Sequence, residues 1–170
     1  MVEAIDGIAG RAAISLYIHI PYCREICWYC GCNTGAANRV HRLTAYLDRL
    51  EQEIALHARH LDPMARVGRI AFGGDSPNAI SPQQFDRLVA TLKRSFDCRD
   101  AVVSVEVDPR GFDREWADAL ERNGVSRVSL GVQTLSPAIQ AAIGRVQPGA
   151  MIEHTVALLR DVRSGAAMLV

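Results

Sequence analysis

The sequence predicts an α/β fold of successive parallel β/α units, about four of them, followed by the start of a fifth strand. Short apolar strand-like runs alternate with amphipathic helical runs, and short turns join them. Several strands also alternate apolar and polar residues, whereas parallel strands covered on both faces read as continuous apolar runs. We therefore expect a curled sheet whose polar, concave side holds a polar ligand.

The first half of the chain predicts two of these units. A strand at 16–20 precedes a cysteine-rich loop, and a helix follows over about 43–60, with His57 and His60 at its surface. A second strand at 69–72 ends in Gly73-Gly74-Asp75-Ser76-Pro77. The run Ser81-Pro82-Gln83-Gln84 then predicts a helix that begins with a capping box and a proline in its first turn.

The second half predicts the remaining units. A strand at 102–107 leads to a helix that begins near Asp113 and stops at Asn123-Gly124. A strand at 127–132, a short helix from Ser136 and a helix over about 151–162 come next. Residues 167–170 read as the first residues of a fifth strand. We expect one domain, with 1–14 as a loose N-terminal lead-in and 15–170 as the core.

Composition narrows the possible partners. The 170 residues carry 19 basic and 19 acidic side chains, so neither nucleic acid nor another polyanion is implied as a partner. No apolar run approaches the roughly 20 residues that span a membrane. The N-terminus has no apolar stretch of a secretory signal, and with the cysteine usage this predicts a reducing, cytoplasmic location.

Four cysteines lie within ten residues, at Cys23, Cys27, Cys30 and Cys32. Disulfides fit poorly, because the total of five cysteines is odd and a chain of this length can build a core without them. A structural zinc site usually needs two ligand pairs separated by a dozen or more residues, and no second pair follows. Closely spaced thiolates on one loop are typical of an iron–sulfur cluster, which is the interpretation we favour.

The spacing places Cys23, Cys27 and Cys30 on three irons of a [4Fe–4S] cluster. Cys32 is a candidate for the fourth iron, although it would need a tight turn to reach the last corner. If Cys32 does not bind, one iron keeps an open position that can coordinate a small molecule, as catalytic metal sites do.

Polar groups are expected to meet at one mouth of the sheet. The cysteine loop, the Gly73-Gly74-Asp75 turn, Glu106 with Asp108, and Gln133 all follow or end predicted strands. Ligands collect at the carboxyl ends of strands in α/β barrels and open sheets.

The Cys-x3-Cys-x2-Cys loop after a strand resembles the cluster motif of radical S-adenosylmethionine (SAM) enzymes. The strings Tyr17-Ile-His-Ile-Pro21, Cys30-Gly-Cys-Asn33 and Glu106-Val-Asp-Pro-Arg110 resemble, within that superfamily, the oxygen-independent coproporphyrinogen III oxidase (coproporphyrinogen dehydrogenase) family. The match runs from about Ser15 to the C-terminal residues. It implies a partial TIM-type barrel of the radical SAM kind, truncated at both ends.

The resemblance also implies roles for individual residues. Cys23, Cys27 and Cys30 match the ligands of the [4Fe–4S] cluster, and Cys32 matches a cysteine associated with a second SAM molecule. The remaining matches are to SAM-binding positions, namely Tyr17, Tyr29, Gly74, Asp75, Ser76, Glu106, Gln133 and Arg145. The family's turn reads Gly-Gly-Gly-Thr-Pro, so Asp75 is a departure that either pairs with the SAM ammonium or crowds a position that needs glycine.

The implied reaction is the oxidative decarboxylation of two propionates of coproporphyrinogen III, which gives protoporphyrinogen IX in porphyrin and haem biosynthesis. It begins when an electron from the cluster cleaves SAM to methionine and a 5′-deoxyadenosyl radical. The implied partners are the porphyrinogen substrate and an electron donor, and the intact family implies a monomer. We expect the truncated chain alone to be poorly stable and catalytically impaired.

Two rival functions remain at this point. One is a haem chaperone homologous to the oxidase, although the cysteine pair Cys30-Gly-Cys32 and the string at 106–109 favour the oxidase. The other is a non-catalytic fragment that binds zinc or a bare iron–sulfur cluster.

Overall fold

The computed structural model describes residues 13–28, 30, 31, 34–161 and 167–169. Its main sheet is parallel throughout and has the order β1 (Ala13–Ile20), β4 (Arg66–Gly74), β5 (Val102–Val107), β6 (Arg127–Leu130) and β7 (Ala167–Leu169). The strand order follows the chain order, which is the arrangement of successive β/α units in a barrel. The predicted α/β class and the start of a fifth strand are confirmed.

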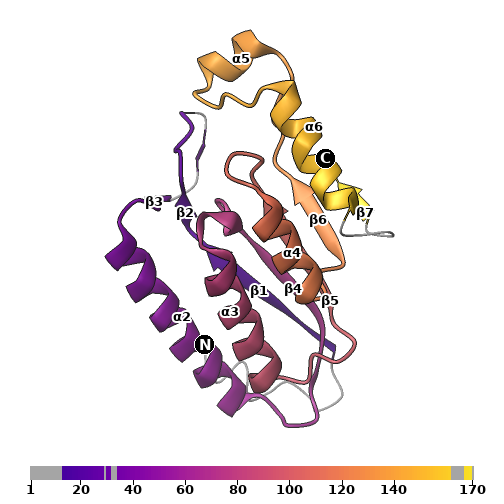
Figure 1. Ribbon diagram of the computed structural model, residues 1–170. Coiled ribbons are helices and arrows are strands. Elements are labelled where there is room, and N and C mark those ends of the chain that lie inside the picture. The colour runs from indigo at the N-terminus through magenta and orange to yellow at the C-terminus, as the bar shows by residue number, and fades with distance from the viewer. Residues whose placement is uncertain (1–12, 29, 32–33, 162–166, 170) are drawn as a thin grey trace.

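The helices of these units lie side by side on one face of the sheet (Figure 1). They are α2 (Val40–His60), α3 (Pro82–Ser95), α4 (Arg114–Arg122) and α6 (Gly149–Asp161). The short helix α5 (Pro137–Ala142) and the single turn η1 (Pro77–Ala79) lie in connections, and β2 (Tyr22–Cys23) pairs with β3 (Gly35–Ala36) at the cysteine loop. The predicted helices are all present, each within about three residues of its expected start.

The predicted bounds of three strands are wrong. The strand predicted at 16–20 begins at Ala13, because its pairing with β4 extends back to the pair Ala13–Arg66. The strand predicted at 69–72 runs from Arg66 to Gly74, because its pairing with β1 continues to the pair Ile20–Gly74 and takes both turn glycines into the strand. The strand predicted at 127–132 ends at Leu130, since the Gly131 amide donates across to the Val107 carbonyl and the Val132 amide folds back to the Leu130 carbonyl.

Helix starts follow the sequence signals. Ser81 accepts from the Gln84 amide at 3.2 Å, and the Gln84 side chain accepts from the Ser81 amide at 2.8 Å, so the predicted capping box is present. Asp113 caps α4 by accepting from the Trp116 amide at 2.9 Å. Gly124 ends α4 with a positive φ of 72°, as the predicted Asn-Gly stop requires.

The core lies between the sheet and these helices. Phe85 of α3 contacts Phe72 of β4 and Trp116 of α4, with ring centroids 5.0 and 5.4 Å apart, and all three side chains are fully buried. The strands contribute alternate residues to this layer, including Val103, Val105 and Val128. This packing fixes the strand positions and therefore the positions of the loops that follow them.

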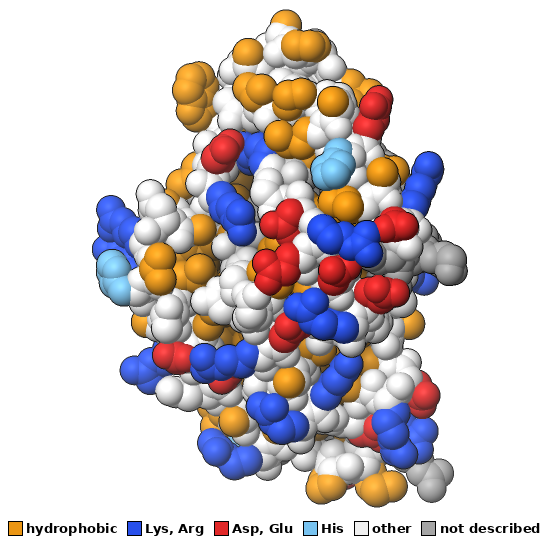
Figure 2. All heavy atoms as spheres, in the orientation of Figure 1, with side chains coloured by type: hydrophobic (Ala, Val, Ile, Leu, Met, Phe, Trp, Pro, Cys, Tyr) orange, Lys and Arg blue, Asp and Glu red, His pale blue; other side chains and the backbone are white. Residues whose placement is uncertain are grey.

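The other face of the sheet is polar, as predicted. Ser104 is half-buried, and Glu106 and Ser129 are exposed, whereas their neighbours along the strands are buried. On the helical side, basic and acidic side chains are interspersed over the outer surface (Figure 2). Ion pairs join adjacent helices there, for example Arg87 with Asp48 and Arg122 with Asp86. None of the helices in the described part of the chain has the length and hydropathy to cross a bilayer.

Candidate cofactor site

A cavity of about 450 Å³ lies at the carboxyl ends of the strands. The register places four strand ends at this edge, because Ile20 pairs with Gly74 and Val107 pairs with Leu130. Eight of the site residues predicted from the sequence line the cavity: Cys23, Cys27, Cys30, Gly74, Asp75, Glu106, Gln133 and Arg145. Residues that the sequence places about 120 positions apart therefore meet at one mouth.

Four predicted site residues are not among those that line the cavity. Ser76 is buried, with its Oγ 3.6 Å from Cys23 Sγ. Tyr17 is mostly exposed and lines a smaller neighbouring cavity of about 200 Å³. It still lies on the polar face, since a Cβ added to Gly73 would be 3.0 Å from the Tyr17 hydroxyl and 3.1 Å from Glu106 Oε2. The other two, Tyr29 and Cys32, lie outside the described residues.

The cysteines in the described residues are free thiols. Cys23, Cys27 and Cys30 share the cavity wall, yet no group of three His, Cys, Asp or Glu side chains in the described ranges converges on a point where one metal ion would bind. A single zinc ion needs its sulfur ligands about 2.3 Å from one centre, whereas a cluster takes one thiolate at each of several irons. The three thiols share one wall of the cavity, as the cluster predicted from the sequence requires.

Cys23 has a hydroxyl-rich environment under the loop. Burial raises the pKa of its thiol above the ordinary value, hydrogen bonds with Ser76 and Thr34 oppose this rise, and the carboxylates of Asp75 and Asp108 add to it. A thiol in such a place remains protonated until a metal displaces the proton. The two hydroxyls are positioned to donate to the sulfur once it carries charge.

Cys27 lies against two buried guanidinium groups. Arg110 Nη2 and Arg145 Nη1 each lie 3.3 Å from Cys27 Sγ. Burial alone would lower the pKa of Arg110, but its hydrogen bonds and ion pair with Asp108 raise it above the usual range, with smaller contributions from Cys27. Arg110 is therefore a permanent cation beside this sulfur.

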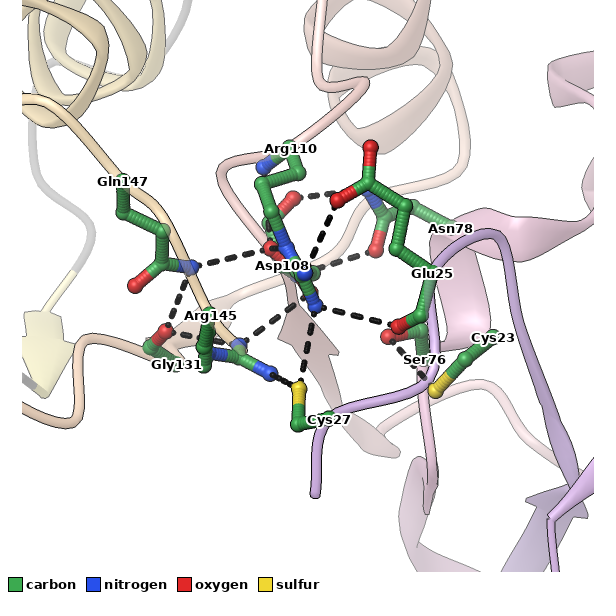
Figure 3. A network of polar contacts seen from close by, with 10 residues as sticks. All are labelled: Cys23, Glu25, Cys27, Ser76, Asn78, Asp108, Arg110, Gly131, Arg145 and Gln147. Atoms are coloured by element: carbon green, nitrogen blue, oxygen red, sulfur yellow. Dashed lines mark hydrogen bonds and ion pairs between the residues drawn. The ribbon is translucent and has the colours of Figure 1, made fainter. Parts of the chain in front are cut away.

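Asp108 is the centre of a polar network that connects these groups (Figure 3). Its carboxylate accepts hydrogen bonds from Arg110 Nη2 at 2.8 Å and from Gln147 Nε2 at 3.0 Å. It also forms an ion pair with Arg145 Nη2 at 3.1 Å. Its backbone exchanges two hydrogen bonds of 2.9 Å with the Asn78 amide. The network links β5, η1 and the loop before α6 to the cysteine loop.

Three members of this network were not predicted from the sequence: Asn78, Arg110 and Gln147. Arg110 stands in the motif string at 106–110, and its place directly after a strand end was an available signal. Asn78 and Gln147 occur in connections that show no periodicity, so only the fold reveals them.

Several polar atoms of the cavity are buried and have no hydrogen-bond partner among the described residues. They are both carboxylate oxygens of Asp75 and the Nε of Arg145. An unpartnered buried carboxylate is costly, so a ligand with a positive group is expected next to Asp75. Arg145 Nε is correspondingly a free donor for a negative group. An amino acid moiety carries both charges, so these residues fit the methionine end of SAM.

Gly74, the residue before Asp75, lies very close to the end of β1. Its φ is 112°, and an added Cβ would lie 2.8 Å from His19 Nδ1 and 3.0 Å from the Ile20 carbonyl. The next residue is fixed by the Asp75 amide, which donates to the same Ile20 carbonyl at 3.1 Å. Only glycine fits here without displacing β1 or its histidine.

The family model of the radical SAM superfamily matches residues 17–169. The chain therefore belongs to the radical SAM superfamily, whose cofactors are the [4Fe–4S] cluster and SAM that the sequence predicts. A solved structure of anSMEcpe with bound SAM and a peptide, 16% identical and with a TM-score of 0.63, shares the fold over 92% of this chain and 42% of its own.

More similar relatives are oxygen-independent coproporphyrinogen III oxidases. One from Bradyrhizobium diazoefficiens is 40% identical over 160 residues, and one from Helicobacter pylori is 33% identical over 158 residues. The solved coproporphyrinogen III oxidase of Escherichia coli superposes with a TM-score of 0.89 at 31% identity, over 98% of this chain and 38% of its own. The chain spans 35% of the length of the two sequence relatives.

The geometry at Gly74 predicts the effect of adding one methyl group there. Gly74→Ala should weaken SAM binding and destabilise the protein by more than Gly124→Ala, measured by calorimetry and urea unfolding. Gly124, with a φ of 72°, is near the left-handed helical region, where an alanine costs roughly 1–2 kcal/mol, and a Cβ there has nothing within 4 Å. Gly74, with a φ of 112°, lies outside that region and also has no space for a Cβ. Equal losses in the two variants would contradict the close approach at Gly74.

Proposed function

We propose that this chain is the radical SAM core of an oxygen-independent coproporphyrinogen III oxidase. The observation that carries the proposal is the shared cavity, in which three free thiols meet an unpartnered buried carboxylate and a buried guanidinium. The choice of reaction is supported by the relatives of this chain that are named coproporphyrinogen III oxidases. The proposed substrate is coproporphyrinogen III, with a one-electron donor as partner, a monomeric state and a reducing cytoplasmic setting.

In this proposal Cys23, Cys27 and Cys30 hold the [4Fe–4S] cluster. When bound, the cluster and SAM supply the radical chemistry that starts the oxidation of a propionate side chain. The chain's own residues bind and orient. The hydroxyls of Ser76 and Thr34 would donate to the sulfur of Cys23 once it is a cluster ligand, and Gly74 lets the end of β4 lie close to β1 at the edge of the cavity.

The remaining site residues bind SAM. Asp75 pairs with its ammonium group and Arg145 Nε donates to its carboxylate, which satisfies the unpartnered atoms. Glu106, on the polar face of β5, and Gln133, in the segment after β6, line the same cavity and would be further contacts of SAM. From the family resemblance we also propose that Tyr17 and Tyr29 flank the cofactor and that Cys32 contacts a second SAM molecule.

The cluster assignment predicts a difference between two cysteine variants. After anaerobic reconstitution, Cys27→Ala should lose most of its iron and sulfide and should form no 5′-deoxyadenosine from SAM with a chemical reductant. Cys98→Ala removes a half-buried thiol outside the loop and should retain both properties. Zinc without iron or sulfide in the parent protein would refute the proposed function, and so would equal iron contents in the two variants.

The role of Asp75 predicts a selective loss of affinity. Asp75→Asn should raise the Kd for SAM roughly tenfold to a hundredfold, because a hydrogen bond to a charged group contributes about 1.5–3 kcal/mol. Iron content should be unchanged. Asp100→Asn, at an exposed turn, is the matched control and should bind SAM like the parent. If Asp75→Asn also binds like the parent, Asp75 crowds the turn and does not hold the ammonium.

A further inference from the structure

The sulfur of Cys27 has an unusual electrostatic environment for a cysteine that binds a cluster. Arg110 and Arg145 each place a guanidinium nitrogen 3.3 Å from it, and their side chains are only 7% and 9% exposed. Buried charges interact strongly because little water screens them. Two cations in this position stabilise negative charge on the sulfur and on any group that the sulfur binds.

The two cations are only partly neutralised. Asp108, 7% exposed, is the buried carboxylate that pairs with both of them, at 2.8 Å to Arg110 and 3.1 Å to Arg145. Glu25 also pairs with Arg110 at 3.0 Å, but its side chain is 68% exposed and water screens its charge. The buried part of the network therefore carries about one net positive charge next to Cys27.

Arg110 and Arg145 differ in their access to the cavity. Arg145 lines the cavity and has an unpartnered Nε, so it can also contact SAM. Arg110 is not among the residues that line the cavity. Its guanidinium contacts Asp108, the side chain and carbonyl of Glu25, and the sulfur of Cys27. Its direct contact with a proposed cluster ligand is the one with Cys27.

We propose that Arg110 is a positioning residue that sets the reduction potential of the cluster through Cys27, and that Asp108 limits its effect. This inference rests on the proposed function, since it needs a cluster on Cys27. Reduction by a one-electron donor lowers the charge of a [4Fe–4S] cluster by one and breaks no bond. A cation and its hydrogen bond at a ligand sulfur stabilise the reduced form, because they balance the added negative charge.

The electrostatic role predicts shifts of opposite sign for the two members of the pair. Arg110→Gln removes a positive charge and should lower the midpoint potential, whereas Asp108→Asn removes a negative charge and should raise it. A purely structural role for the pair would disturb the loop in both variants and would not produce opposite signs. We expect each change to alter the ratio of reduced to oxidised cluster about tenfold at a fixed potential, or about 59 mV for one electron.

The experiment is a redox titration of the reconstituted full chain, followed by electron paramagnetic resonance, with iron and sulfide measured on each sample. The matched control is Arg99→Gln, which removes an exposed arginine that pairs with Asp97, and it should keep the parent midpoint. Arg110→Lys retains the charge and should restore most of the loss seen in Arg110→Gln.

Midpoints that shift in the same direction in Arg110→Gln and Asp108→Asn, or that equal the parent value, would overturn the proposal. An Arg110→Lys midpoint equal to that of Arg110→Gln would also overturn it. If Arg110→Gln holds no cluster, Asp108→Asn decides, and a midpoint that is not above the parent value refutes the role. A parent protein without iron and sulfide would instead refute the proposed function itself.

Discussion

The buried ion network around Asp108 is the interaction on which the site depends. It connects the end of β5 to the loop before α6 through Arg145 and Gln147, and to the cysteine loop through Arg110. Buried charges are tolerated only when they are paired and hydrogen-bonded, so each member keeps the others in place. The network thereby holds a loop with little regular structure against a rigid sheet, which is what a cofactor site requires.

The parallel sheet supplies the common edge on which this network is built. Ile20 is level with Gly74, and Val107 is level with Leu130, so the groups that follow these strands emerge side by side. Hydrophobic packing of Phe72, Phe85 and Trp116 on the helical face fixes that register from the other side. The apolar face of the sheet, packed under the helices, therefore provides rigidity, and the polar face and its loops carry the residues of the candidate site.

The helix signals, the alternation of the strands and most of the cavity residues could be predicted from the sequence, because their signals were local. The capping box at Ser81, the stop at Gly124 and the alternation of strand residues each depend on neighbours in the chain. The cavity residues were found because parallel strands bring their carboxyl ends together. The bonds of Arg110 and Gln147 to Asp108 could not be predicted, since they join segments 39 positions apart or depend on side-chain direction after a strand end. The strand end at Gly74 was missed for a similar reason, because it depends on pairing with β1.

The central claim is that Cys23, Cys27 and Cys30 would hold a cluster at a cavity that would also take SAM. Electron paramagnetic resonance of the reduced, reconstituted chain with and without SAM tests it most directly. We predict that SAM changes the g-values of the cluster signal, because it binds the iron that has no protein thiolate. A cluster signal that is identical with and without saturating SAM would contradict the account.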